Sequence, residues 1–272
     1  MADLINSSPN DAMPAVEPPV ITAVENGVCT ITMNRPANRN ALSVEMVRGL
    51  ADAFQKATEL PEVHLVVLTG NGPTFCAGAD LKERRTVTEG ATNDSPPAFV
   101  SVFETIQRLP KVVVAKLNGS ALAGGLGLAC ACDLVIAPAS AIFGFTEVRI
   151  GVAPAIISVV CLPRMSVADS AELFLTGQRF SAERALAAGL VNRVVPDAEI
   201  DGETAQLVSM LRLGGPKALA ATKDVLRRVP TIADRSAAFR EMAVLSGSLF
   251  SSDEAAEGMA AFAQKRPPNW TL

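Results

Sequence analysis

Continuous apolar runs, separated by amphipathic segments, constrain the fold of this chain more than any other feature of its sequence. Unbroken runs are typical of strands covered on both faces, as in parallel sheets, whereas half-exposed strands alternate apolar and polar residues. We therefore expect an α/β core in which strands and helices alternate along the chain. The runs are VHLVVLTG (63–70), KVVVAKLNG (111–119), LVIA (134–137) and AIFGF (141–145).

The residues around these runs predict further elements. Two strands are expected at 20–24 and 28–33, joined by the hairpin-forming pair Asn26-Gly27. Ser43 is expected to cap a helix that ends near Leu60. Apolar positions three and four apart predict more helices, which are 98–109, 166–175, 181–188, 215–228, 232–248 and 254–264. We expect a disordered tail (1–19), a core domain (20–200) and a helical C-terminal region (201–272), with a mobile loop at 82–97.

Composition excludes several classes of function. The 272 residues carry a net charge of −4, which argues against a dominant nucleic-acid-binding surface. The one histidine, His64, lies in an apolar run and is expected to be structural, so neither a histidine-based metal site nor a Ser-His-Asp triad is predicted. Five cysteines without zinc spacing are expected to be reduced and buried. We expect no metal and no redox cofactor.

The sequence also bears on location. The first 19 residues contain acids and prolines and match neither a secretory signal nor a transit peptide. The apolar stretch at 121–131 is too short to cross a bilayer. A cytoplasmic protein without membrane partners is therefore expected.

Two glycine-containing turns are candidates for chemistry. NGSALAGGLGLACACD (118–133) follows an expected strand and is predicted to open a helix near Leu126, where Gly124 and Gly125 allow a tight turn with accessible N–H groups. FCAGADL (75–81) resembles it, with Gly78 preceding the N–H of Ala79. Close helix–strand packing would explain the glycines equally well. Together, however, two such turns favour an oxyanion hole that receives one carbonyl oxygen.

Six segments in this order resemble the crotonase, or enoyl-CoA hydratase/isomerase, superfamily, and the similarity extends from residue 20 to residue 268. The resemblance implies a spiral of β-β-α units with a helical C-terminal region, assembled as a homotrimer or a dimer of trimers. The segments are MNRPANRNAL (33–42), FCAGADL (75–81), NGSALAGGLGLACACD (118–133, ending at Asp133), FGFTEVRIGVAP (143–154), LTGQRFSAERALAAGLVNRVVP (175–196) and GMAAFAQKRPP (258–268).

The resemblance also assigns roles to residues. It implies that the N–H groups of Ala79 and Gly124 hold the thioester oxygen of an acyl-CoA substrate, whose coenzyme A is the only cofactor-like group expected. Coenzyme A contacts carry over to Arg39, Ala41, Leu42 and Lys82, and to Phe262 and Lys265 of the C-terminal helix, which sometimes reaches a neighbouring subunit. The alternative for Lys82 and Lys265 is that both are solvated surface charges.

One catalytic position departs from the family pattern. Well-studied hydratases have two glutamates, whereas this chain has Gly127 at the first position and Glu147 at the second. The resemblance makes Glu147 the general acid and base, and the alternative is a surface ion pair with Arg149. Hydration of a 2-enoyl-CoA, including branched or dicarboxylic relatives such as methylglutaconyl-CoA, is the leading interpretation. The second interpretation is Δ3-Δ2-enoyl-CoA isomerisation, which needs only one base. The third is a catalytically weak acyl-CoA-binding protein.

Overall fold

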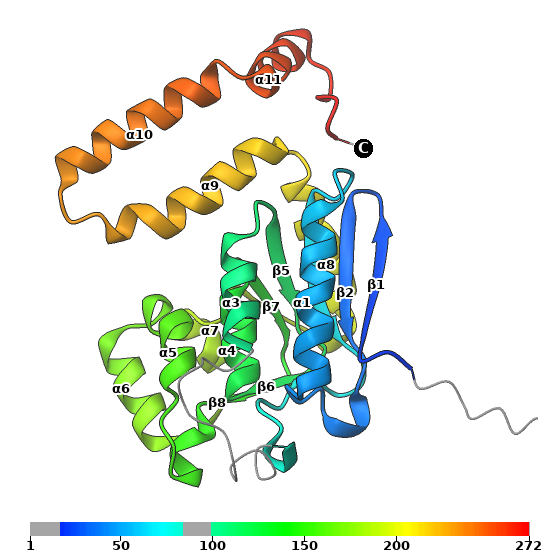
Figure 1. Cartoon of the computed structure of the whole chain (residues 1–272), viewed down its shortest axis with the longest axis vertical. Coiled ribbons are helices and arrows are strands. Elements are labelled where there is room, and N and C mark those ends of the chain that lie inside the picture. Colours follow the sequence, from blue (N-terminus) through cyan, green and yellow to red (C-terminus); the bar gives the residue numbers. More distant parts are fainter. Residues whose placement is uncertain (1–16, 84–98, 272) are drawn as a thin grey trace, which may run out of the picture.

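The computed structural model describes residues 17–83 and 99–271, and within them the strands form two sheets. The larger sheet has the order β1-β2-β3-β5-β7-β10 and lies at the centre of the molecule (Figure 1). The smaller sheet has the order β4-β6-β8-β9. The strands are β1 (Val20–Glu25), β2 (Val28–Met33), β3 (Leu65–Gly70), β4 (Thr74–Cys76), β5 (Val112–Lys116), β6 (Ser120–Leu122), β7 (Leu134–Pro138), β8 (Ile142–Gly144), β9 (Arg179–Ser181) and β10 (Arg193–Val195).

The larger sheet confirms the predicted hairpin and the predicted parallel core. β1 and β2 pair in antiparallel fashion, and both turn residues between them, Asn26 and Gly27, have positive φ angles. From β2 to β10 the adjacent strands are parallel, in the pairs β2–β3, β3–β5, β5–β7 and β7–β10. The run at 63–70 begins its strand only at Leu65, because the N–H groups of His64 and Leu65 both donate to the turn carbonyl of Gly27. His64 therefore lies just outside the strand rather than in its interior.

The smaller sheet explains the β-β-α repeat. β3, β5 and β7 each lie in the larger sheet, and the strands that follow them, β4, β6 and β8, each lie in the smaller one. The run at 141–145 thus contributes to this second sheet. β4, β6 and β9 were not predicted, because each has three residues and no apolar run of its own. The expected crotonase-like spiral is confirmed.

Helices cover the larger sheet on both faces. Ser43 caps α1 as predicted, since its side chain accepts a hydrogen bond from the Met46 N–H. The α-helices are α1 (Val44–Glu59), α3 (Phe99–Arg108), α4 (Gly124–Ala131), α5 (Ala155–Cys161), α6 (Val167–Thr176), α7 (Ala182–Ala187), α8 (Ile200–Leu211), α9 (Pro216–Arg228), α10 (Arg235–Phe250) and α11 (Asp253–Gln264). Short 3-10 helices are η1 (Pro36–Asn38), η2 (Thr146–Ile150), η3 (Leu162–Arg164), η4 (Asp197–Glu199) and η5 (Val229–Thr231).

The helix boundaries correct the sequence analysis at three points. α4 begins at Gly124, two residues before the predicted start near Leu126. α5 and α8 were not predicted. The tail at 1–16 and most of the loop at 82–97 lie outside the described residues.

Two apolar clusters pack on opposite faces of the larger sheet. On one face Val66 and Leu68 of β3 pack into the main core with α1, α3 and α4. On the other face Val67 packs with Leu207 of α8 in a smaller cluster. All five cysteines are unpaired and buried, as predicted. Among residues 17–83 and 99–271, no helix combines the length and apolar character needed to cross a membrane.

Helices α9, α10 and α11 form an arm that projects from the core (Figure 1). The arm is anchored through Lys223 of α9, which is only 7% exposed. Its Nζ lies 2.8 Å from Asp133 Oδ2 and donates to the carbonyl oxygens of Ile106 (2.7 Å) and Lys111 (3.0 Å). A buried ammonium satisfied in this way fixes α9 against the end of β5.

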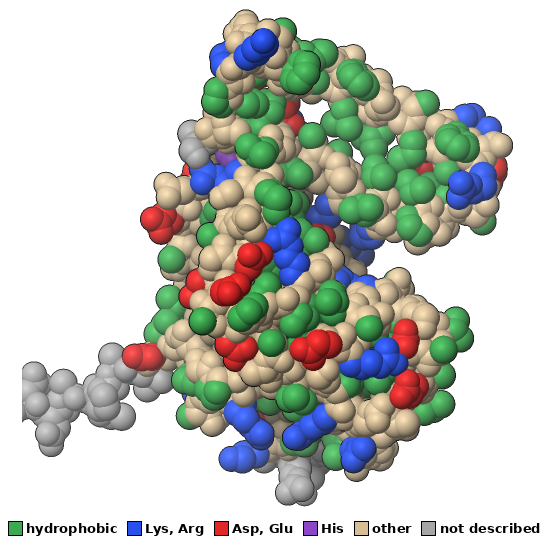
Figure 2. Space-filling view, turned by 180° about the vertical axis from the view of Figure 1, so that it is seen from behind, with side chains coloured by type: hydrophobic (Ala, Val, Ile, Leu, Met, Phe, Trp, Pro, Cys, Tyr) green, Lys and Arg blue, Asp and Glu red, His purple; other side chains and the backbone are tan. Residues whose placement is uncertain are grey.

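The rest of the arm exposes large apolar side chains, and Figure 2 shows hydrophobic groups gathered along it. So many exposed large apolar side chains on one part of the molecule are unusual for a chain that stays monomeric. The residues, each at least 54% exposed, are Leu226, Phe239, Val244, Phe250, Met259 and Phe262.

We predict that Lys223→Ala lowers the free energy of unfolding by about 3–5 kcal/mol, because it leaves the half-buried Asp133 carboxylate without its cation. Chemical denaturation monitored by circular dichroism would measure this loss. Lys217→Ala, at an exposed position of the same helix, is the matched control and should change stability by no more than about 0.5 kcal/mol. Equal effects of the two variants would contradict the anchoring role.

Candidate active site

The two glycine-containing turns lie against each other. The first follows β4 and includes Gly78, whose φ of +93° favours glycine. The second precedes α4 at Ala123. A Cβ atom built on Gly78 would lie 3.0 Å from the Ala123 Cβ and 3.2 Å from the Gly124 nitrogen. Any larger residue at position 78 would therefore push the two turns apart.

Each turn leaves one backbone N–H group without a protein acceptor. The N–H of Leu42 donates to the Gly78 carbonyl (2.8 Å) and fixes the first turn, and the N–H of Ala123 donates to Gly144 (2.8 Å) and fixes the second. Within residues 17–83 and 99–271, the N–H groups of Ala79 and Gly124 have no such partner. Gly124 is the first residue of α4, whose N-terminal dipole adds partial positive charge.

The tight turn itself is at Ala123 rather than at the glycines that were predicted to form it. Ala123 has a φ of 49°, a strained conformation for a residue with a side chain. Gly125 is needed for a different reason, because its Cβ would lie 2.2 Å from the carbonyl oxygen of Cys76. The absence of that side chain lets α4 pack directly on the end of β4, which brings the two turns together.

Both turns and Glu147 line one cavity of about 720 Å³. Most of its wall is apolar, so a substrate inside it loses most of its contact with water. The lining residues are Ala77, Ala79, Leu81, Phe99, Ala123, Gly124, Thr146, Glu147, Arg149, Ile150, Val152, Ala153, Pro154, Ala155, Ile156, Ile157, Gly177 and Arg179.

Glu147 is the one acidic side chain among these lining residues. It belongs to η2, and burial raises the pKa of its carboxyl above the ordinary value, with partial opposition from its own backbone N–H. Its Oε2 atom is buried and has no hydrogen-bond partner among the residues that the structure describes. A carboxyl group with an unused buried oxygen is well suited to exchange protons with a bound molecule.

The alternative of an ion pair between Glu147 and Arg149 is wrong. Arg149 instead donates from Nε to the Gly177 carbonyl oxygen at 2.8 Å. No ion pair involves Glu147 in the described part of the chain.

Ile157 of α5 occupies the space beside Gly127, and sequence reasoning did not identify this residue. A Cβ atom on residue 127 would lie 2.3 Å from Ile157 Cγ2 and 2.8 Å from Ile157 Cβ. Ile157 is buried and also lines the cavity. The position of the family's first glutamate is thus filled by an apolar side chain from another helix, so a glutamate could not replace Gly127 without moving α5.

A second pocket of about 280 Å³ adjoins the cavity and contains three of the predicted coenzyme A contacts, Arg39, Ala41 and Lys82. The two pockets share Ala77, Ala79 and Leu81 as lining residues. The fourth residue, Leu42, is buried, and its Cδ1 would lie 3.4 Å from a Cβ atom on Gly124.

Asn40, which sequence reasoning also missed, holds the loop of this second pocket in place. Its fully buried side chain donates to the carbonyl oxygens of Asn71 (3.0 Å) and Thr74 (2.9 Å). Its Oδ1 accepts from the Arg35 N–H. A buried amide with all three contacts fixes the loop against the end of β3.

Phe262 and Lys265 do not join the other predicted residues. Phe262 is 87% exposed on α11, and Lys265 ends that helix in the left-handed conformation. Figure 1 places α11 at the end of the molecule opposite to α5, whose residues Ala155, Ile156 and Ile157 line the cavity. Within one chain these two residues line neither of the two pockets.

Known proteins share both the sequence and the fold of this chain. The enoyl-CoA hydratase/isomerase family pattern matches residues 23–272. A putative enoyl-CoA hydratase of Thermus thermophilus is 37% identical over 91% of this chain and 99% of its own length. The 2,3-dehydroadipyl-CoA hydratase of Escherichia coli is 34% identical over 92% of this chain and 98% of its own length. The crystal structure of an enoyl-CoA hydratase/isomerase from Marinobacter aquaeolei is 32% identical, with a TM-score of 0.87 over 93% of this chain and 99% of that one.

We predict that Gly127→Ala and Ile157→Ala are coupled. Gly127→Ala alone should destabilise the fold by about 1–3 kcal/mol, because the new methyl group overlaps Ile157. Ile157→Ala alone should cost about 2–5 kcal/mol through the cavity that it creates. The double variant should lose at least about 0.5 kcal/mol less than the sum, as measured by denaturant unfolding. Strict additivity would show that α5 and α4 are not in this contact.

Proposed function

This chain belongs to the enoyl-CoA hydratase/isomerase family, and we propose that it adds water across the C2=C3 double bond of a 2-enoyl-CoA. Enzymes of the enoyl-CoA hydratase type act on acyl-CoA thioesters, and this chain is one of them. The proposal of hydration rests on the shared cavity. Two N–H groups without acceptors among the described residues and one half-buried carboxyl group line this same space.

In this proposal the N–H groups of Ala79 and Gly124 bind the thioester oxygen. Addition of water to C3 places negative charge on that oxygen as an enolate forms, so donors fixed in advance stabilise the transition state more than the substrate. Loss of one such donor in other enzymes raises the barrier by ~2.7–4 kcal/mol. The fit between Gly78 and Ala123 supports this role, because it fixes the spacing of the two donors.

Glu147 performs both proton transfers in the proposed reaction. Its carboxylate takes a proton from water while the water oxygen bonds to C3, and the resulting acid then delivers that proton to C2 of the enolate. The product carries a hydroxyl group on C3 and a new hydrogen on C2, and Glu147 returns to its starting state. Its raised pKa supports this double role, since burial makes the protonated carboxyl group easier to form while the ionised group still accepts a proton.

The coenzyme A moiety is assigned to the second pocket. Arg39 and Lys82 are cations beside that pocket, and Ala41 and Leu42 belong to the same loop. Its continuity with the larger cavity supports the assignment, because a thioester held by Ala79 would extend in both directions. Phe262 and Lys265 would then act on a neighbouring subunit of a trimer or a dimer of trimers. The exposed apolar surface of the arm supports such an assembly.

The acyl group is proposed to be branched or dicarboxylic, with methylglutaconyl-CoA as the type of compound. The cavity of about 720 Å³ has room for more than a short linear chain, and one relative is named as a hydratase of 2,3-dehydroadipyl-CoA, a dicarboxylic thioester. Five unpaired thiols support a cytoplasmic location.

Δ3-Δ2-enoyl-CoA isomerisation is the second candidate, and one observation favours it. Glu147 is the one carboxyl group among the described residues of the cavity wall, and Ile157 fills the place of a second. A single base suffices to move a proton along an acyl chain, whereas hydration must also orient water. A catalytically weak acyl-CoA-binding protein remains the third candidate.

We predict that Glu147→Gln reduces hydration by about 10²–10⁴-fold while acyl-CoA binding is retained, because the amide cannot exchange the proton. The assay follows the loss of the conjugated thioester absorbance from a trans-2-enoyl-CoA. Glu199→Gln, at an exposed position of η4, is the control and should leave the rate unchanged.

Three outcomes of this assay would argue against hydration by Glu147. Unchanged turnover in Glu147→Gln would reject its catalytic role. Absorbance that instead appears from a 3-enoyl-CoA, with no loss from the 2-enoyl-CoA, would favour the isomerase. If neither signal appears although acyl-CoA raises the melting temperature, the chain acts as a binding protein.

The pH profile tests the protonation state of Glu147. Burial raises its pKa above the ordinary value of 4.5, and the ionised form is the one that accepts the proton from water. We therefore expect kcat/KM for hydration to fall about tenfold per pH unit below an apparent pKa that is higher than 4.5. Melting temperatures over the same range would separate this effect from unfolding. A midpoint at or below 4.5 would mean that the carboxyl group is fully solvated.

A further inference from the structure

Arg149 and Arg179 are the two cationic residues among the described residues that line the acyl cavity, and both are exposed to solvent. Arg149 belongs to η2, two residues after Glu147, and Arg179 is the first residue of β9. Neither side chain forms an ion pair with any residue of the described chain. Arginine carries a positive charge under physiological conditions, so two cationic groups border this cavity, and the one acidic residue among its described lining residues is Glu147.

The backbone brings the two arginines together. Gly177 precedes β9 with a φ of +58°, and a Cβ atom there would lie 3.2 Å from Arg149 Cγ. A Cβ atom on Gly144, the end of β8, would lie 3.6 Å from the Cα of Arg179. Since β8 pairs with β9 and continues towards η2, both arginines emerge from one corner of the smaller sheet.

Arg149 is held in position by its own hydrogen bonds. Its Nε donates to the Gly177 carbonyl at 2.8 Å and its Nη2 to the Thr176 carbonyl at 3.4 Å. A guanidinium has five N–H groups, so three remain available to a ligand. Because the side chain is already ordered, an anion that it binds does not have to immobilise it.

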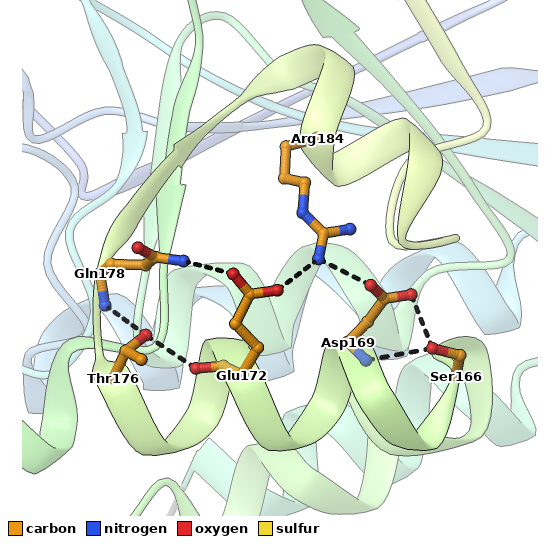
Figure 3. A network of polar contacts seen from close by, with 6 residues as sticks. All are labelled: Ser166, Asp169, Glu172, Thr176, Gln178 and Arg184. Atoms are coloured by element: carbon orange, nitrogen blue, oxygen red, sulfur yellow. Dashed lines mark hydrogen bonds and ion pairs between the residues drawn. The ribbon is translucent and has the colours of Figure 1, made fainter.

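A separate network fixes the turn that orders Arg149, and it also occupies nearby carboxylates (Figure 3). Arg184 of α7 bonds to both Asp169 and Glu172 of α6, at 2.6 and 2.9 Å. Glu172 in turn accepts from the Gln178 side chain at 3.2 Å. The two acidic groups of α6 therefore pair with Arg184 rather than with Arg149 or Arg179.

We propose that Arg149 and Arg179 bind a carboxylate at the end of the acyl group, so that the preferred substrates are enoyl-CoA thioesters of dicarboxylic acids. This inference rests on the proposed function, because it places the acyl chain in the cavity of Glu147. The phosphates of coenzyme A are the other available anions. They are assigned to the pocket of Arg39 and Lys82, whose wall includes neither Arg149 nor Arg179.

A matched pair of substrates tests the proposal. 2,3-Dehydroadipyl-CoA and trans-2-hexenoyl-CoA have the same chain length and the same coenzyme A, and they differ in the terminal carboxylate. We expect kcat/KM to be roughly ten- to a hundredfold higher for the dicarboxylic thioester, which is the range for hydrogen bonds to a charged group. Adipoyl-CoA and hexanoyl-CoA have no double bond to hydrate. Their dissociation constants, measured by calorimetry, compare the binding of the two acyl groups without turnover.

Variants of Arg179 identify the source of the preference. Arg179→Gln should lower the dicarboxylic-to-monocarboxylic ratio about tenfold, and Arg179→Lys should restore part of it, because it keeps the charge without the planar fork. Arg240→Gln, on the exposed face of α10 with 72% of the arginine side chain accessible, removes the same charge far from the cavity. It should leave the ratio unchanged.

The outcomes separate the two proposals. Carboxylate recognition would be overturned if kcat/KM in the natural protein were about equal for the dicarboxylic and the monocarboxylic thioester. It would also be overturned by a high ratio of the two kcat/KM values that Arg179→Gln does not change, even if both thioesters are hydrated. If neither thioester is hydrated but adipoyl-CoA binds more tightly than hexanoyl-CoA through Arg179, hydration is wrong and carboxylate recognition stands.

Discussion

The contact between two backbone turns is the constraint on which the candidate site depends. Gly78 fits against Ala123 and Gly124 with no room for a side chain, and Gly125 lets α4 rest on the end of β4. The turns come from successive β-β-α units, so pairing of strands in the smaller sheet brings them together. The strain at Ala123 is tolerated because packing on both sides fixes its conformation. Two N–H donors at a fixed spacing are the result.

The carboxyl group beside these donors gains its properties from what surrounds it. Glu147 has a raised pKa because apolar residues exclude water from it, and Arg149 does not neutralise it because that side chain bonds to the Gly177 carbonyl. Ile157 removes the space for a second carboxyl group. Packing has thus left one half-buried carboxyl group in a mainly apolar cavity, with Arg149 hydrogen-bonded to the backbone rather than paired with it.

The C-terminal arm shows why one chain does not contain every predicted contact. Lys223 fixes the middle of α9 to the core, but α10 and α11 extend away from it and keep large apolar side chains in solvent. Helical periodicity at 232–248 and 254–264 predicted that these helices exist. Periodicity could not show where α10 and α11 pack. An apolar helix face has the same sequence pattern whether it covers the core of its own chain or that of another copy. Phe262 and Lys265 therefore do not line the pockets of the other residues to which the family resemblance assigned coenzyme A contacts.

The sequence by itself determined the elements with strong local signals, namely the buried runs of β3, β5 and β7, the Asn26-Gly27 hairpin and the Ser43-capped helix. Its motifs also identified the two turns and Glu147, because each is a short stretch of adjacent residues. Only the tertiary structure decided that the tight turn is at Ala123, that Ile157 fills the space beside Gly127, and that Arg149 and Arg179 meet at one corner. Each depends on contact between segments distant in sequence, and no local pattern records such a contact.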